Sequence, residues 1–252
     1  MSNKVEQIKP YDGQESKREQ VEQMFNSIAP AYDFMNRAMT LGIDRWWRRV
    51  AVNGVMRHLK ANAIPPEKVD VLDVATGTGD FAIGLQKRLK PHSVTGIDLS
   101  NGMLDVARKK VASAGLTNIS FNQADCLSMS FDDDSFDVVT VAFGVRNFED
   151  IEQGYRQMYR VLRKGGILSV VELSTPRNRI IRWFYDIYTL HIIPAIGSLK
   201  SGDRNAYRYL PLSIAAVPQG NDMLDIMRRV GFSQCRVQRL TLGTCSIYTA
   251  IK

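Results

Sequence analysis

The chain has 252 residues, of which 44% are apolar and 23% are charged. This composition is that of an ordinary globular protein and excludes a disordered, collagen-like or coiled-coil chain. Lys and Arg number 33 against 26 Asp and Glu, which gives a net charge of +7. A basic balance of this size is compatible with nucleic acid, an anionic membrane surface or an anionic small molecule, and it selects none of them.

The three cysteines and three histidines predict neither a disulfide framework nor a metal site. The cysteines include no Cys-x-x-Cys pair, and His58, His92 and His191 lie far apart. The N-terminal residues are charged and lack the apolar segment of a secretory signal. No stretch reaches the roughly 18 apolar residues of a membrane helix. The sequence therefore predicts a cytoplasmic protein in a reducing compartment.

The first 64 residues predict a helical cap. Residues 1–14 are polar and are expected to be frayed, whereas the residues up to Leu59 carry apolar side chains at helical spacing. The basic pair Arg48 and Arg49 is expected on a solvated helix face. The Pro65-Pro66 pair then marks a boundary.

From residue 65 to residue 176 the pattern alternates between strands and helices. Such alternation indicates βαβ units and a parallel, doubly wound sheet, and we expect this core to bind the cofactor. The expected strands are residues 69–75, 93–99, 119–124, 136–143 and 167–173, and the expected helices are residues 81–89, 102–114 and 151–162.

The last segment, residues 177–252, changes character again. Helices are expected over residues 177–193 and 223–230. Residues 235–242 and 244–252 alternate as two strands, for which a closing antiparallel hairpin is the simplest placement. The sequence thus predicts a single α/β domain, with a mostly parallel seven-stranded sheet between a helical cap and a C-terminal part of lid helices and hairpin.

The strongest local motif is the glycine loop Gly77-Thr78-Gly79, between an expected strand and an expected helix. Glycines let a ligand approach the backbone, and the helix N-terminus offers free N–H groups. Asp98 ends the next strand about 20 residues later, where a carboxylate can accept both hydroxyls of an adenosine ribose. This arrangement indicates a nucleotide-type ligand.

Carboxylates around the loop bear on the kind of nucleotide. Gly77–Ala82 also satisfies the dinucleotide pattern G-x-G-x-x-A, so an NAD-dependent oxidoreductase stays open as an alternative. Asp73 in the first strand and Asp80 at the helix N-terminus argue against it, because they would repel a pyrophosphate. Asp125, after the third strand, can bind an adenine amino group. Three carboxylates favour a cationic ligand, and S-adenosylmethionine carries a sulfonium and an ammonium.

More selective stretches are Tyr32-Asp-Phe-Met-Asn36, Gly42-Ile-Asp-Arg-Trp-Trp47, Phe143-Gly-Val-Arg-Asn147, Arg160-Val-Leu-Arg-Lys-Gly-Gly166, Tyr207-Arg-Tyr-Leu210 and Ser213-Ile214. With the glycine loop, they make the chain resemble a class I S-adenosylmethionine-dependent methyltransferase of Rossmann-like fold. More narrowly, the chain resembles the ubiquinone/menaquinone biosynthesis C-methyltransferase family, from about Met24 to the C-terminus.

The resemblance implies a set of cofactor contacts. They fall on Thr78 in the glycine loop and on Asp98 at the ribose. Asp125 and Cys126 flank the adenine, with Cys126 as a small apolar neighbour. Ala142 stands where the family often has Ser, so that hydroxyl contact is absent. The expected cofactor site comprises Asp73, Gly77, Thr78, Gly79, Asp98, Asp125 and Cys126.

The resemblance also implies methyl transfer to a ring carbon of a polyprenylated quinol, either demethylmenaquinol or the benzoquinol precursor of ubiquinol. The ring carbon becomes nucleophilic when the neighbouring phenol loses its proton, so the site must stabilise the phenolate oxygen and orient the carbon. Arg146 is the candidate for the oxyanion and Asn147 for orienting a hydroxyl or carbonyl. The base is not identified, and Tyr32, His191 and a water stay open.

The partners follow from the same resemblance. Arg179–His191 carries aromatic and apolar side chains at helical spacing, which indicates either packing on its own domain or a lid that contacts a membrane surface. Such contact would be transient, at the inner face of the membrane. No nucleic acid is expected, because Ala142–Asn147 lacks an Asn/Asp-Pro-Pro-aromatic motif. An RNA or DNA methyltransferase and a non-catalytic scaffold remain alternatives, and a homodimer stays open.

Overall fold

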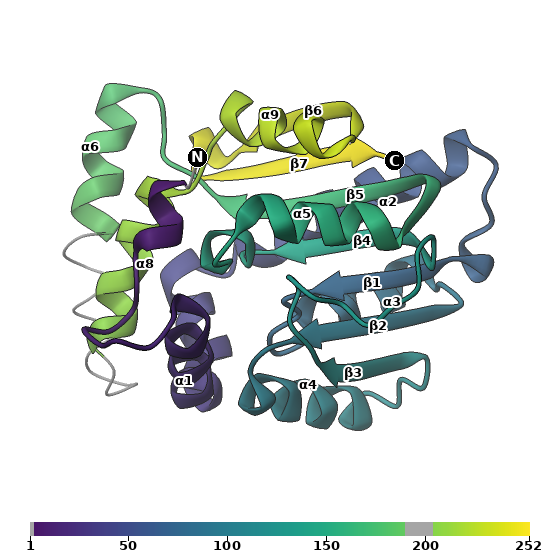
Figure 1. The fold of residues 1–252 in the computed structure, drawn as a ribbon, viewed down its shortest axis with the longest axis horizontal. Coiled ribbons are helices and arrows are strands. Elements are labelled where there is room, and N and C mark those ends of the chain that lie inside the picture. Colours follow the sequence, from purple (N-terminus) through teal and green to yellow (C-terminus); the bar gives the residue numbers. More distant parts are fainter. Residues whose placement is uncertain (1–2, 190–203) are drawn as a thin grey trace.

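A computed structural model describes residues 3–189 and 204–252. Its centre is one seven-stranded sheet in the order β3-β2-β1-β4-β5-β7-β6 (Figure 1). Among the described strands, β7 alone runs antiparallel to its neighbours β5 and β6. The prediction of a mostly parallel sheet closed by a hairpin is therefore confirmed. The strands are β1 (Asp70–Val74), β2 (Ser93–Asp98), β3 (Ile119–Gln123), β4 (Phe136–Ala142), β5 (Leu162–Leu173), β6 (Ser233–Leu240) and β7 (Cys245–Ile251).

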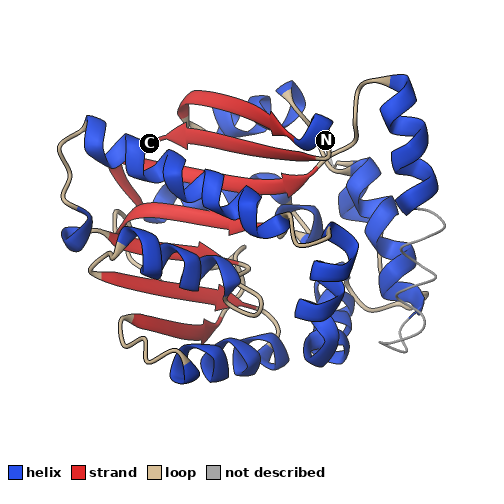
Figure 2. Cartoon of the chain, turned by 180° about the vertical axis from the view of Figure 1, so that it is seen from behind, coloured by secondary structure: helices blue, strands red, loops and turns tan. Residues whose placement is uncertain are grey.

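Helices cover both faces of this sheet. In Figure 1, α5 and α9 lie in front of the sheet, and the view from behind in Figure 2 shows α2 and α3 on the opposite face. Because both faces are covered, the central strands are apolar on both sides, and Val71, Leu72 and Val74 of β1 are fully buried. The helices around the sheet are α2 (Asp44–Ala61), α3 (Asp80–Leu89), α4 (Asn101–Ser113), α5 (Ile151–Val161) and α9 (Asn221–Val230).

Three further helices lie beyond one end of the sheet. They are α1 (Lys17–Thr40), α6 (Arg179–Ile187) and α8 (Arg204–Ala216). Figure 1 shows them on the left, at the carboxyl ends of the parallel strands. Ligands of open α/β sheets bind at this end, so these helices are placed to enclose a site.

The N-terminal segment is packed, and the expectation that it is frayed was wrong for residues 3–11. Lys4–Gln7 forms a short 3-10 helix, η1, in which Val5 is fully buried. The Glu6 carboxylate accepts from the backbone N–H of Ile151, 3.0 Å away, at the start of α5. The Lys17 ammonium donates to the carbonyl oxygens of Val5 (2.6 Å) and Arg146 (3.1 Å). One buried apolar side chain and these polar contacts fix the segment, although its polar composition did not indicate that it would pack.

Most expected elements in the sheet region lie within two residues of the observed ones. Strand β5 is the exception, because it begins at Leu162, five residues before the expected start. The pairing register with β4 shifts between Phe136 and Val138, and this irregularity accommodates the Gly165-Gly166 pair within the strand. Helix α8 was not anticipated, since Pro211 interrupts its pattern. Residues 190–193 of the expected helix 177–193, and with them His191, lie outside the described residues.

Candidate functional site

A first cavity lies where the carboxyl ends of the strands meet α1. Its lining includes Gly77 after β1, Asp98 at the end of β2, and Asp125 and Cys126 after β3. Ala142, the last residue of β4, also lines it. We refer to it as the strand-end cavity. Four residues that the sequence assigned to cofactor binding thus converge from three neighbouring strands.

Asp98 holds the glycine loop in place. Its Oδ2 atom accepts from the backbone N–H of Gly77 (2.8 Å), and its Oδ1 atom accepts from that of Ser100 (2.9 Å). Burial raises the pKa of the Asp98 carboxyl above its usual value. Each carboxylate oxygen can accept a further hydrogen bond, so Asp98 can bind two ligand hydroxyls while it fixes the loop. Gly77 has a φ of 56°, a conformation that favours glycine.

Asp73 and Thr78 lie beside this cavity and support its walls. Asp73 is buried beneath the loop, and its carboxylate accepts from the hydroxyls of Thr76 and Thr140, each at 2.6 Å. Burial raises the pKa of Asp73 to about 6. The Thr78 hydroxyl donates to Asp33 of α1 at 2.6 Å. Both side chains therefore use the polar atoms named here for contacts within the protein.

Gly79 has a packing role in the same loop. A Cβ atom there would lie 3.0 Å from side-chain atoms of both Ala107 and Phe121. The absence of a side chain lets α3 approach α4 and β3.

Helix α1 covers the strand-end cavity, and several of its residues line it. Arg18 forms an ion pair with Asp125 at 2.9 Å. Asn26 Oδ1 accepts from the Ser100 hydroxyl (2.7 Å) and from the backbone N–H of Gly102 (2.9 Å). Together with the contact between Asp33 and Thr78, these bonds fasten α1 along its length to the ends of β2, β3 and α4. The expected helical cap is therefore part of the binding site.

A second cavity, of about 550 Å³, lies under the helices and adjoins the first. We refer to it as the cap cavity. Tyr32 and Phe143 line both cavities, so they stand at the boundary between them. Phe143 has a φ of 61°, a strained conformation that clusters at functional sites. The other apolar and aromatic residues that line the cap cavity are Met39, Leu41, Ile43, Trp47, Leu173, Tyr185, Tyr188, Leu210 and Ile214.

Arg146 is buried at the floor of the cap cavity. Its Nη1 atom donates to Glu172 Oε1 (2.9 Å) and to the carbonyl oxygen of Phe143. Burial alone would lower the pKa of Arg146, but the Glu172 carboxylate together with Tyr32 and Tyr209 outweighs the effect of burial, so the pKa is raised and the guanidinium stays charged. Its Nε atom is buried and has no hydrogen-bond partner among the described residues. A buried donor in that state indicates a ligand.

Asn147 and Tyr32 both line the strand-end cavity, and Tyr32 also lines the cap cavity. The Oδ1 atom of Asn147 accepts from the Tyr209 hydroxyl at 3.1 Å. Burial raises the pKa of the Tyr32 phenol, so its hydroxyl stays protonated at neutral pH. The structure brings both residues close to Arg146, but the Glu172 carboxylate that holds Arg146 was not anticipated. A lone acid in the apolar run Ser169–Leu173 was the available signal.

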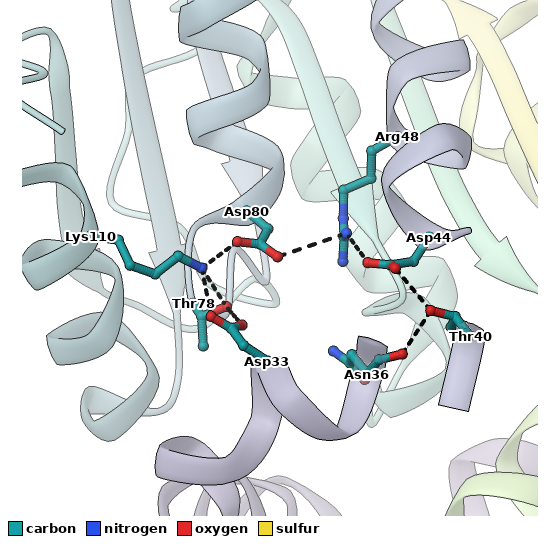
Figure 3. Close-up of polar contacts among 8 residues, drawn as sticks. All are labelled: Asp33, Asn36, Thr40, Asp44, Arg48, Thr78, Asp80 and Lys110. Carbon is teal, nitrogen blue, oxygen red and sulfur yellow. Dashed lines mark hydrogen bonds and ion pairs between the residues drawn. The ribbon is translucent and has the colours of Figure 1, made fainter. Parts of the chain in front are cut away.

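A chain of ion pairs joins α1, α2, α3 and α4 (Figure 3). Lys110 of α4 contacts Asp33 (2.9 Å) and Asp80, and Arg48 contacts Asp44 at 2.6 Å and Asp80 at 3.9 Å. The expectation of a solvated Arg48 was wrong, because its side chain is only 12% exposed and lies between two carboxylates. This chain of ion pairs links α1 and α4 to Asp44, which lines the cap cavity.

In the part of the chain that the structure describes, neither the Cys126 thiol nor a metal-type cluster forms a second centre. Burial raises the pKa of the Cys126 thiol well above its usual value, so it stays protonated and unreactive. No three His, Cys, Asp or Glu side chains among the described residues gather as metal ligands would. Within the same residues, no helix is long and apolar enough to cross a membrane.

Solved structures share this fold. The cyclase SpnF shares the fold, with a TM-score of 0.67 and 16% identity over 93% of this chain and 96% of that one. A methyltransferase from Aquifex aeolicus matches at a TM-score of 0.52 and 19% identity, over 77% of this chain and 88% of that one. Because one of these neighbours is called a cyclase, the fold alone does not fix the reaction.

The sequence comparisons fix the family. The profile of the ubiE/COQ5 methyltransferase family matches residues 13–252, and the chain belongs to that family. The demethylmenaquinone methyltransferase of Bacteroides fragilis is 49% identical over the full length of both chains. The corresponding protein of Porphyromonas gingivalis is 44% identical over 98% of each chain. The ubiquinone/menaquinone biosynthesis C-methyltransferase UbiE of Geotalea daltonii is 42% identical over 94% of this chain and 97% of that one.

Proposed function

We propose that the protein methylates a ring carbon of demethylmenaquinol and so produces menaquinol. The observation that carries this proposal is the apolar, aromatic cap cavity of about 550 Å³, which meets the strand-end cavity at Tyr32 and Phe143. Its volume suits a small-molecule site with a few polar groups. The relatives named demethylmenaquinone methyltransferase support the naphthoquinol, and the relative named UbiE supports a benzoquinol as a second substrate.

The residues of the strand-end cavity fit S-adenosylmethionine, which supplies an activated methyl group when bound. Asp98 accepts from the two ribose hydroxyls, and Asp125 lies where it can accept from the adenine amino group. Cys126 packs beside the adenine as a small apolar group. Gly77 lets the cofactor approach the backbone of the loop. The carboxylates around the cavity suit a cationic ligand and disfavour a pyrophosphate.

Arg146 and Asn147 then act on the quinol. The phenolate oxygen that forms during the reaction is stabilised by the charged Arg146, whose Nε atom is a buried donor without a hydrogen-bond partner among the described residues. Asn147 orients a second oxygen of the ring through its side-chain amide, which Tyr209 holds at 3.1 Å. Tyr32 stands at the boundary between the cavities, where the methyl group reaches the ring carbon. These roles are supported by the position of the three residues in the lining of the two cavities.

Helix α6 is the surface through which we propose that the protein meets the membrane. None of its residues is buried, and Ile180, Trp183 and Phe184 are 70%, 60% and 63% exposed. This exposure argues against the packing of that stripe on its own domain. Arg179 and Arg182 add positive charge on the same helix, which suits an anionic bilayer. The cap cavity reaches α6 at Tyr185 and Tyr188, so a prenyl chain in the bilayer would be close to the cavity.

A turnover assay tests this function. The purified protein is incubated with S-adenosylmethionine and either demethylmenaquinol or the demethylated benzoquinol, and the quinones are analysed by mass spectrometry. The expected product is menaquinone, heavier than its precursor by one methylene group. Transfer RNA and duplex DNA serve as competing acceptors, and NADH replaces the methyl donor in a parallel reaction. Methylation of nucleic acid, or no methylated quinol, would refute the proposal.

A further inference from the structure

Methylation of a quinol needs a group that removes a phenol proton, and few residues of the cap cavity can do so. Arg146 stays protonated and cannot accept a proton. Burial raises the pKa of Tyr32 and Tyr188, and that of Tyr185 to about 12, so these phenols hold their own protons at neutral pH. Among the described residues of the lining, a side chain that acts as the base must therefore be another one.

The described histidines lie elsewhere. His58 is exposed and contacts the carbonyl oxygen of Gly165 at 3.1 Å. His92 precedes β2 and lies at the amino ends of the parallel strands, opposite the cavities. Neither imidazole can reach a ring bound beneath α1 and α6.

Asp44 is the only carboxylic acid among the described residues that line the cap cavity. It is the first residue of α2, where the helix dipole favours a negative charge. Its Oδ2 atom forms an ion pair with Arg48 at 2.6 Å, so the resting carboxylate is balanced (Figure 3). The sequence stretch that carries Asp44 marked the family, but no role was assigned to this residue.

The hydrogen bonds of Asp44 allow both protonation states. The Thr40 hydroxyl lies 2.8 Å from Asp44 Oδ1 and 2.7 Å from the carbonyl oxygen of Asn36. One hydroxyl hydrogen cannot be donated to both acceptors. When Asp44 is ionised, Thr40 donates to it. When Asp44 is protonated, it can donate to Thr40, which then donates to Asn36. A proton can thus arrive at Oδ1 without any side chain moving.

We infer that Asp44 is the catalytic residue that accepts the phenol proton of the quinol. This inference rests on the proposed function. The proton passes from the quinol oxygen to Asp44 Oδ1, and an electron pair of the ring carbon forms the bond to the methyl group. The bond between that methyl group and sulfur breaks, and its electron pair stays on sulfur. The ring carbon then loses its hydrogen to solvent as a proton, and Asp44 returns its proton to the oxygen, so that one proton is released overall.

The charged and titratable groups around Asp44 come from several elements. Arg48 faces it from its own helix, and Asp80 of α3 and Lys110 of α4 lie beyond Arg48 (Figure 3). Across the cavity lie Arg146 and the phenols Tyr32, Tyr185 and Tyr188. Among the described residues that line the cavity, Asp44 alone has a carboxyl side chain.

The test is the pH dependence of turnover in the Asp44→Asn variant. At neutral pH we expect turnover to fall by about 10²- to 10⁴-fold, the range for a general base, with unchanged affinity for S-adenosylmethionine in calorimetry. Because the variant must use quinol that has ionised unaided, its rate should rise about tenfold per pH unit toward the phenol pKa near 10. The deficit relative to the unchanged protein should therefore shrink at high pH.

Two further variants complete the experiment. Glu152 also lies in the first turn of a helix and pairs with an arginine four residues on, Arg156, but none of the described residues of α5 lines either cavity, so Glu152→Gln should keep the full rate. If Asp44→Asn does not fold, Asp44→Glu should retain the original pH profile at a reduced rate. The assignment of Asp44 as the base would be overturned by a pH-independent deficit or a full rate in Asp44→Asn, or by an altered pH profile in Asp44→Glu. None of these results would affect the proposed function. If the unchanged protein methylates no quinol, the proposed function falls together with the assignment.

Discussion

The strand-end cavity and the cap cavity are built on different principles. The floor of the strand-end cavity comes from the ends of neighbouring parallel strands, and backbone N–H groups of Gly77 and Ser100 fix its central carboxylate, Asp98. The cap cavity is assembled from helices and loops far apart in the sequence, and buried ion pairs such as Arg146 with Glu172 hold its polar groups. One site rests on the sheet and the other on side-chain contacts between separate segments.

This difference predicts how each cavity responds to substitution. A change in the strand-end cavity should weaken cofactor binding by the worth of individual hydrogen bonds, because the sheet keeps the remainder in place. A change in the cap cavity should leave cofactor binding intact and reduce turnover. Separate measurements of cofactor affinity and of turnover therefore distinguish the two sites.

Apart from Asp44→Asn, the largest effect is expected for Arg146→Lys. Lysine keeps a positive charge opposite Glu172 but lacks the planar guanidinium and its Nε donor. Turnover should fall by about 10²- to 10³-fold, the usual effect of removing an oxyanion donor, while the affinity for S-adenosylmethionine stays unchanged. Arg163→Lys, at the ion pairs with Asp70 and Asp137, is the matched control and should keep full turnover. Joint loss of cofactor affinity and activity in Arg146→Lys would place Arg146 on the cofactor side.

Asp98→Asn should separate the cavities in the opposite sense. A hydrogen bond to a charged group contributes about 1.5 to 3 kcal/mol, so the loss of one such increment predicts roughly 10- to 150-fold weaker cofactor binding. The amide also offers an N–H group to a backbone N–H, which disturbs the loop at Gly77. Calorimetry measures the change, with Asp105→Asn on the exposed face of α4 as the control. Unchanged affinity in a folded Asp98→Asn variant would refute the ribose assignment.

The same contrast explains what the sequence could predict. The positions of Gly77, Asp98 and Asp125 follow from local rules, because parallel strands bring their carboxyl ends to one edge and each residue directly follows or ends a strand. Local periodicity also placed most elements of the sheet within two residues. The ligand contacts themselves, on Thr78 and its neighbours, stay predictions.

The cap cavity could not be predicted in this way. Nothing in the spacing of Arg146 and Glu172, or of Thr40 and Asp44 beneath α6, indicates that these segments enclose one space. The burial of Val5 was missed for the same reason, since a single apolar residue in a polar segment carries no periodicity. Resemblance to a family supplied Arg146, Asn147 and Tyr32 where the pattern of residues could not.

A smaller effect is expected on the rim of the cap cavity, in the double variant Trp183→Ser and Phe184→Ser. Removal of large buried aromatics costs about 3 to 5 kcal/mol, whereas these exposed side chains should leave the melting temperature nearly unchanged. Binding to vesicles with anionic phospholipid should weaken, and turnover of long-chain quinols should fall more than that of a short-chain analogue. Met56→Ser, at an exposed position on α2, is the control. Equal losses on both substrates, or a variant that does not fold, would contradict the membrane-facing role.

The smallest expected effect concerns the support of the strand-end cavity. Burial raises the pKa of Asp73 from 3.8 to about 6, so the folded protein binds this proton more tightly than the unfolded chain. The stabilisation is therefore complete below pH 3.8 and is lost as the pH rises through about 6, and it amounts to about 3 kcal/mol at most. In Asp73→Asn, which cannot titrate, the melting temperature should decline less across this window. A variant of the exposed Asp225, which pairs only with Arg228 in the contacts seen here, should keep the original decline. If the melting temperature of Asp73→Asn declines as steeply as that of the unchanged protein, another group titrates in this pH range. Cofactor affinity measured over the same pH range would then show whether that group belongs to the strand-end cavity or to the cap cavity.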